Sequence, residues 1–73
     1  MSDKKIAIIG GGNLGASIAE GLHKSALYQS KNITVTRRKI ELLKHLSDEG
    51  LNIHSDNRLA VKNSDIIILA VKP

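Results

Sequence analysis

Four of the six glycines of this chain lie within the six residues from Gly10 to Gly15. Gly10, Gly12 and Gly15 have the spacing G-x-G-x-x-G. The first glycine permits a tight turn out of a strand, the second leaves room for a pyrophosphate against the backbone, and the third lets a helix pack close to that strand. A helix beginning here would offer its first N–H groups, those of Asn13 and Leu14, to phosphate. The turn therefore predicts dinucleotide binding. The competing interpretation is a glycine-rich loop, whereas a Walker phosphate loop is excluded because no Gly-Lys-Ser/Thr follows.

A basic cluster, Arg37-Arg38-Lys39, follows about 20 residues after the glycine turn. At this distance a site that prefers NAD usually has Asp or Glu for the ribose 2′-hydroxyl, but here the position is Thr36. A 2′-phosphate would be repelled by a carboxylate and bound by guanidinium groups, and the hydroxyl of Thr36 could donate to it. The cluster thus favours NADP(H), with NAD(H) possible. Exposed basic residues at a helix start are the alternative, which weighs more for Lys39 than for Arg37.

No catalytic residue and no metal ligand can be assigned from the remaining polar residues. The chain has no cysteine, and His23, His45 and His54 have no metal-ligand spacing with neighbouring carboxylates. No Ser/His/Asp arrangement can be argued from so few candidates, and Tyr28 falls at a predicted helix end, where packing is its expected role.

Short apolar segments alternate with helical patterns along the whole chain. Expected strands cover residues 5–9, 33–36, 51–54 and 65–71, and expected helices cover residues 13 to about 25–28, 38–49 and 58–62. This β-α-β-α-β-α-β order predicts the α/β class: a partial, Rossmann-type doubly wound parallel sheet of strand order 3-2-1-4. The sheet would be truncated after strand four, which leaves an apolar edge exposed.

Particular residues are expected to shape these helices. Leu14, Ile18 and Leu22 recur at spacing four and predict one apolar face. Gly50 is expected to relieve the left-handed turn after the second helix. The candidates to cap the third helix are Ser55, Asp56 and Asn57.

Length, charge and composition narrow the class of protein. Seventy-three residues allow one small domain, and a net charge of +4 favours anionic partners. Nucleic acid is disfavoured because the chain has one Tyr and no Phe or Trp for base stacking. The longest strongly apolar run, residues 66–71, is far shorter than the ~20 residues of a membrane helix. With no signal peptide behind Met1 either, a cytoplasmic protein is expected.

Several segments together resemble the N-terminal domain of pyrroline-5-carboxylate reductase, and the resemblance covers the whole chain. They are Lys5 to Gly15, Ile33 to Arg37, Ser55 to Asn57 and Asp65 to Pro73. The glycine motif is generic, but Gly-Asn-Leu-Gly combined with the closing Ala-Val-Lys-Pro is more specific. The β-hydroxyacid dehydrogenases and the deazaflavin-dependent NADP reductases are similar over the first strand and the glycine turn.

This resemblance implies a place for each matching residue around NADP(H). Ile9, Gly10, Gly11, Gly12, Asn13 and Leu14 would line the pyrophosphate. Arg37 would stand at the adenosine 2′-phosphate, with Asn57 on the adenosine side. Ala70, Val71, Lys72 and Pro73 would pass along the nicotinamide ribose. The competing interpretations are a helix cap for Asn57 and a solvated strand-end lysine for Lys72.

The resemblance also implies the reaction and its limits. The family transfers a hydride from NAD(P)H to the C=N bond of 1-pyrroline-5-carboxylate and so forms L-proline, in proline biosynthesis. Its substrate site and dimer interface lie in a C-terminal helical domain that is absent from residues 1–73, and Gly11 stands where alanine is common. The chain alone is therefore expected to be inactive, whereas the parent protein would be a homo-oligomeric enzyme. A related hydroxy-acid dehydrogenase and a non-catalytic nucleotide-sensing module are the alternatives.

Overall fold

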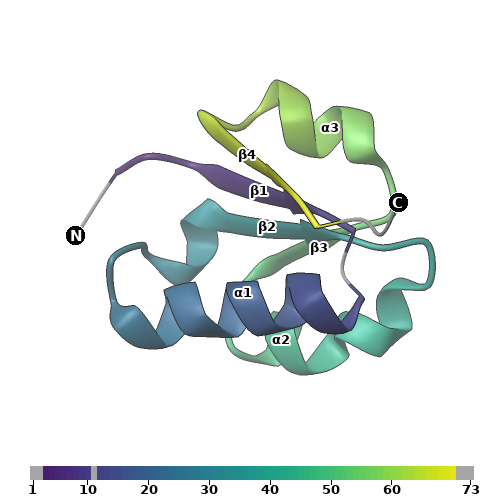
Figure 1. Ribbon diagram of the computed structural model, residues 1–73, viewed down its shortest axis with the longest axis horizontal. Coiled ribbons are helices and arrows are strands. Elements are labelled where there is room, and N and C mark those ends of the chain that lie inside the picture. The colour runs from purple at the N-terminus through teal and green to yellow at the C-terminus, as the bar shows by residue number, and fades with distance from the viewer. Residues whose placement is uncertain (1–2, 11, 71–73) are drawn as a thin grey trace.

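Strand β1 (Ile6–Ile9) lies inside a four-stranded parallel sheet and is buried on both faces. The sheet is completed by β2 (Ile33–Thr36), β3 (Asn52–His54) and β4 (Ile66–Leu69), in the order β3-β2-β1-β4 (Figure 1). The computed structural model describes residues 3–10 and 12–70. Ile9 pairs with Thr36 on one side and with Leu69 on the other, so the carboxyl ends of these three strands are level. The predicted fold class and strand order are confirmed.

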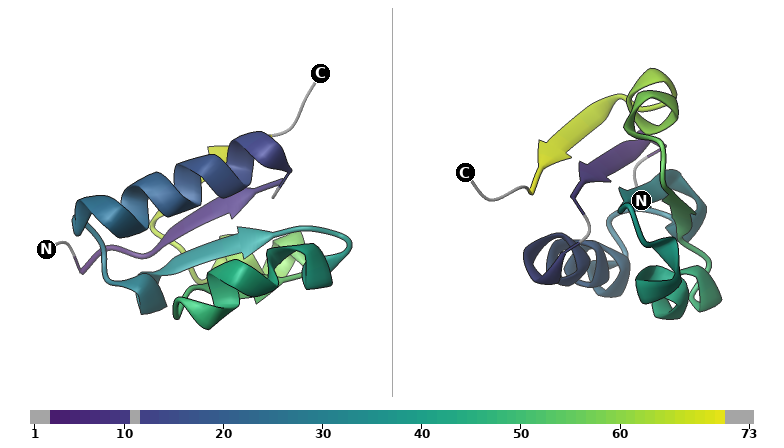
Figure 2. Two further views of the ribbon diagram at one scale, coloured as in Figure 1. Left: turned by 90° about the horizontal axis from the view of Figure 1, so that it is seen from below. Right: turned by 90° about the vertical axis from the view of Figure 1, so that its right-hand side faces the viewer.

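Helices cover both faces of the sheet, as Figures 1 and 2 show. Helices α1 (Asn13–Ser25) and α2 (Lys44–Asp48) lie on one face, and α3 (Asn57–Lys62) lies on the other. Two short 3₁₀ helices, η1 (Ser30–Asn32) and η2 (Ile40–Leu43), precede β2 and α2. The larger core cluster, under α1 and α2, contains Ile6, Ile8, Ala19, Ile33, Val35, Leu43, Leu46, Leu51 and Ala70. The smaller one consists of Ala7, Ile9 and Ala60, under α3.

The second predicted helix differs from the structure. The sequence predicts one helix over residues 38–49. In the structure this segment contains the 3₁₀ helix η2, and the α-helix α2 begins only at Lys44. Leu43, the last residue of η2, and Leu46 in α2 are both fully buried, so each of the two short helices contributes one leucine to the core. The predicted end is correct: Gly50 has φ +95°, and its N–H donates to the Ser47 carbonyl.

Helix α1 starts and ends where the sequence predicts, but its buried face does not include Leu14. Ile18 and Leu22 pack against the core, whereas Leu14 is 59% exposed. Gly15 and Ala19 are the buried residues of this helix. The helix approaches the sheet so closely at its first turn that only a residue without a side chain fits there, and this rotates Leu14 away from the core.

The fourth strand is the exposed apolar edge that the sequence predicts. It forms one side of the sheet, and Ile66, Ile67 and Leu69 are exposed. The expected strand of residues 65–71 is shorter in the structure, where it covers Ile66–Leu69.

Helix α1 ends on a residue in a backbone conformation that suits glycine. Ala26 has φ +60° and ψ +17°, and its N–H donates to the His23 carbonyl. A β-carbon in this left-handed region costs about 1–2 kcal/mol, which glycine avoids at the expense of a more flexible unfolded chain. We therefore expect Ala26→Gly to raise the free energy of unfolding by about 0.5–1 kcal/mol, measured by urea denaturation.

The opposite exchange in the same helix is the control. Gly21 lies in the middle of α1 on its solvent-exposed side, and a β-carbon built there meets nothing within 4 Å. Gly21→Ala should thus also stabilise the chain, by about 0.5–1 kcal/mol. A loss of stability in Ala26→Gly alongside a gain in Gly21→Ala would contradict a left-handed end of α1.

Candidate dinucleotide-binding site

The glycine turn begins directly after β1, as the sequence predicts. Gly10 has φ +95°, a conformation that side chains strongly disfavour, so the chain turns sharply out of the sheet at this residue. Gly12 is the N-cap of α1, and its carbonyl accepts the N–H of Ala16 at 2.9 Å. Gly11 lies outside the described residues.

The third glycine of the motif has the predicted packing role. A β-carbon at Gly15 would lie 2.2 Å from the carbonyl oxygen of Gly10 and 3.4 Å from the side chain of Ile8. A β-carbon at Gly12 would meet nothing within 4 Å. Gly15 thus allows the helix to approach the strand, while the space around a β-carbon at Gly12 is open.

The first turn of α1 can accept an anion. No side chain caps this end of the helix, and its first turn contains no acidic residue. Asn13 and Leu14 are both exposed. At the other end His23 and Lys24 occupy the last turn, where positive charge suits the helix dipole. Backbone N–H groups and the partial positive charge of the helix therefore face solvent beside the glycine turn.

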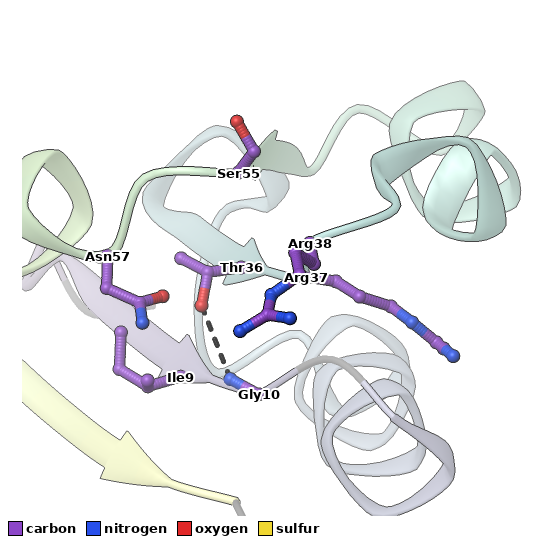
Figure 3. Close-up of a pocket in the computed structure, with 7 residues that line it drawn as sticks. All are labelled: Ile9, Gly10, Thr36, Arg37, Arg38, Ser55 and Asn57. Carbon is purple, nitrogen blue, oxygen red and sulfur yellow. Dashed lines mark hydrogen bonds between the residues drawn. The ribbon is translucent and has the colours of Figure 1, made fainter.

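A cavity of about 150 Å³ opens beside this turn, at the carboxyl ends of the central strands. It is lined by residues that follow three different strands or lie at their ends, as Figure 3 shows: Ile9, Gly10, Thr36, Arg37, Arg38, Ser55 and Asn57. Six of these seven are residues that the sequence singles out for cofactor binding. The structure thus brings the first residue of the glycine turn, the two arginines of the basic cluster and the start of α3 around one cavity.

Ser55 is the lining residue that the sequence does not assign to the site. In the sequence it is a cap candidate and part of the family resemblance, with no ligand of its own. Its position immediately after β3 matches that of Arg37 immediately after β2. Since parallel strands place such residues at one edge of the sheet, the strand pattern contains the signal that would have found it.

The two arginines of the cluster differ in their surroundings. Arg37 is half-buried and its backbone N–H donates to the His54 carbonyl at 3.0 Å, which fixes it between β2 and β3. Arg38 is exposed, and in Figure 3 the two side chains diverge. Lys39 is exposed and is not among the residues that line the cavity.

Thr36 is almost completely buried, with 1% of its surface exposed. Its Oγ1 accepts the backbone N–H of Gly10 at 3.3 Å, drawn as the dashed line in Figure 3. The end of β2 is therefore bonded to the glycine turn through a side chain. Donation from Thr36 to a 2′-phosphate stays a prediction.

The cap of α3 settles how Asn57 is placed. Asp56 is the N-cap, and its Oδ1 accepts the N–H of Arg58 at 2.8 Å. The interpretation of Asn57 as the cap is therefore wrong. Asn57 is the first helical residue instead, and its side chain points toward Ile9 across the cavity (Figure 3).

Residues after β4 lead toward the same edge of the sheet. Ala70 is nearly buried, and its N–H donates to the Ile9 carbonyl at 2.8 Å, beside the start of the glycine turn. The other expected residues of this segment, Val71, Lys72 and Pro73, lie outside the described residues.

Within residues 3–10 and 12–70 there is no group of three or more His, Cys, Asp or Glu side chains that could hold a metal ion. None of the helices described there is long and apolar enough to cross a membrane.

Comparison with known proteins gives matches over nearly all of the chain. Residues 5–73 match a family model described as "NADP oxidoreductase coenzyme F420-dependent". Pyrroline-5-carboxylate reductase 2 of Dictyostelium discoideum is 48% identical over 73 residues, which make up 99% of this chain and 24% of that protein. The solved structure of a pyrroline-5-carboxylate reductase from Coxiella burnetii matches with a TM-score of 0.88 at 36% identity. It covers 99% of this chain, which corresponds to 27% of the Coxiella chain.

An imine reductase from Pseudomonas sp. shares the fold alone, with a TM-score of 0.77 at 24% identity over 93% of this chain and 22% of that chain. The chain thus spans about a quarter of the length of the Dictyostelium and Coxiella relatives named above. These matches confirm the resemblance that the sequence motifs indicate.

Proposed function

The chain belongs to the family described as NADP oxidoreductase, coenzyme F420-dependent, and from this membership we propose that it forms the NADP(H)-binding part of a pyrroline-5-carboxylate reductase. The observation that carries the proposal is that Gly10, at the start of the glycine turn, and Arg37 line the same cavity. Arg37 lines this cavity and would supply a guanidinium for the 2′-phosphate, and the turn that begins at Gly10, which also lines it, leads into the start of α1, whose backbone N–H groups would bind the diphosphate.

The residues around the cavity fit this cofactor in detail. The open space at Gly12 leaves room for the diphosphate against the backbone, next to the N–H groups of Asn13 and Leu14. Arg37 and Arg38 would bind the 2′-phosphate, and no acidic side chain lines the cavity to repel it. Asn57 would contact the adenosine from the opposite wall.

The far end of the cofactor would lie toward β4. The segment from Ala70 to Pro73 would pass along the nicotinamide ribose, since Ala70 lies beside the end of β1. When bound, the cofactor supplies a hydride for the C=N bond of 1-pyrroline-5-carboxylate. The role of this chain in that reaction is to bind and orient the dinucleotide. No proton donor is assigned among its described residues.

A deazaflavin-dependent NADP reductase is the second candidate, because the family description names coenzyme F420. The two candidates would use the same dinucleotide site and differ in the partner that exchanges a hydride with it. The Dictyostelium and Coxiella relatives favour the pyrroline-5-carboxylate substrate. Oxidation of NADPH by 1-pyrroline-5-carboxylate, measured against reduction of coenzyme F420 with the full-length parent protein, would distinguish them.

The proposal predicts a larger thermal stabilisation by NADPH than by NADH. A ligand present at 100 times its dissociation constant stabilises a protein by about 2.7 kcal/mol, which corresponds to a shift of about 10 °C or more in the melting temperature of a domain this small. We expect NADPH to give such a shift in a thermal denaturation experiment and NADH to give a clearly smaller one at the same concentration.

Fragments of the cofactor separate the two parts of the site. Adenosine 2′,5′-bisphosphate should stabilise the chain more than adenosine 5′-monophosphate, because only the first carries the 2′-phosphate. Equal shifts within both pairs would remove the argument for a 2′-phosphate site, and the absence of any shift would remove dinucleotide binding altogether.

A further inference from the structure

The hydrogen bond between Thr36 and Gly10 joins the two halves of the proposed site. Gly10 begins the turn that would hold the diphosphate, and Arg37, which would hold the 2′-phosphate, is the residue after Thr36. Gly10 and Thr36 are 26 positions apart, with the whole of α1 between them, so the two phosphate sites are far apart along the chain. In space Gly10 and Arg37 line the same cavity.

The backbone around Thr36 fixes the position of its hydroxyl. Thr36 pairs with Ile9 in the sheet register, and the next backbone N–H, that of Arg37, donates to His54 on β3. On the far side of β1 the Ile9 carbonyl accepts the N–H of Ala70. The end of β2 is therefore held from both sides, and the Oγ1 of Thr36 extends from this fixed point to the N–H of Gly10.

The side chain of Thr36 is buried, so its hydrogen bond to Gly10 is partly shielded from water. Within residues 3–10 and 12–70, Thr36 is the one polar residue that is buried. A backbone N–H that is taken out of water without a partner is costly, and the Oγ1 of Thr36 accepts the part-buried N–H of Gly10. The bond consequently favours the one arrangement of the turn in which the Gly10 N–H points at β2.

We propose that Thr36 is a positioning residue, whose hydroxyl sets the distance between the diphosphate site at the glycine turn and the 2′-phosphate site at Arg37. This inference rests on the proposed function for the identity of the two sites. It differs from direct binding of the 2′-phosphate by Thr36, since a positioning residue acts on every dinucleotide that uses the turn, whether or not a 2′-phosphate is present.

Thr36→Val tests the proposal, because valine keeps the shape of threonine and replaces only the hydroxyl. In the chain without ligand, we expect the Gly10 amide proton to exchange with solvent about tenfold faster, measured by NMR hydrogen exchange. The affinities for NADPH and NADH, measured by calorimetry below the melting temperature, should both fall by about fivefold to tenfold, with their ratio unchanged. Thr36→Ser, which retains the hydroxyl, should restore both measurements to near the unmodified values.

Thr34→Val is the matched control. Thr34 is on the same strand and the same face of the sheet, two residues earlier, is half-buried, and is not among the residues that line this cavity. It should change neither the Gly10 exchange rate nor either affinity.

Three outcomes would overturn the proposal. In Thr36→Val, a loss of affinity for NADPH alone would make Thr36 a direct phosphate ligand, and an unchanged exchange rate at Gly10 would show that the hydroxyl does not hold the turn. Failure of Thr36→Ser to restore binding would assign the effect to packing. If the unmodified chain bound neither dinucleotide, the proposed function would fail instead, while the exchange rates would still decide whether Thr36 holds the turn.

Discussion

Gly15→Ala is expected to lower the free energy of unfolding by about 3 kcal/mol or more and to abolish dinucleotide binding. The added β-carbon would lie 2.2 Å from the carbonyl oxygen of Gly10, and neither a β-carbon nor a backbone carbonyl can rotate away as the end of a long side chain could. The start of α1 must therefore move away from β1, and with it the N–H groups that would face the diphosphate. Urea denaturation gives the loss of stability, and a thermal shift with NADPH gives the loss of binding.

Alanine substitutions at two other glycines separate the effect of the clash with Gly10 from the effect of replacing any glycine by alanine. Gly21→Ala places the same methyl group on the same helix with nothing within 4 Å, and it should be mildly stabilising. Gly12→Ala also meets no protein atom, so it should leave stability nearly unchanged while weakening binding, because the methyl group would occupy the space proposed for the diphosphate. If Gly15→Ala were as stable as Gly21→Ala, the close approach of α1 to β1 would be wrong.

Arg37→Ala is expected to weaken NADPH binding by about tenfold to a hundredfold and to change NADH binding little. A hydrogen bond between charged partners contributes about 1.5–3 kcal/mol, and only NADPH carries the 2′-phosphate that would accept it. Calorimetric titration of both cofactors against the unmodified chain and the variant measures the two ratios. The preference for NADPH should largely disappear.

Lys39→Ala is the control for charge alone. It removes the same unit of positive charge from the same cluster, but Lys39 does not line the cavity, so its effect on NADPH should be slight and should vanish as salt screens it. Equal losses in Arg37→Ala and Lys39→Ala would mean that NADPH responds to the net charge of the surface and not to a bound guanidinium.

The fold and the outline of the site could be predicted because their signals are local in the sequence. Residues 6–9 are apolar on both faces and are followed at once by glycine, which is enough to predict a buried parallel strand and the turn after it. The position of Arg37 follows from the same reasoning, since a residue directly after a parallel strand lies at its carboxyl edge.

The remaining features depend on contacts between distant segments. The bond from Gly10 to Thr36 requires the exact register of β1 against β2, which no local pattern contains. Asp56 and Asn57 are equally good caps by residue type, and only the backbone conformation decides between them. The exposure of Leu14 follows from the close approach of Gly15 to Gly10, which a pattern of apolar spacing cannot represent.

The outer side of β4 bears on how this chain behaves when it is concentrated. All four of its residues are aliphatic, and its outward main-chain groups lie on the rim of the sheet. Short uncharged segments of this kind are templates onto which strands of other molecules add. The nearest charge along the chain is the carboxylate of Asp65, just before the strand, and it already accepts a hydrogen bond from the backbone of Lys5. Among the residues that the structure describes, this one carboxylate, which already accepts a hydrogen bond, is thus the charge next to β4 in the sequence, and we expect strand addition between molecules to increase with protein concentration.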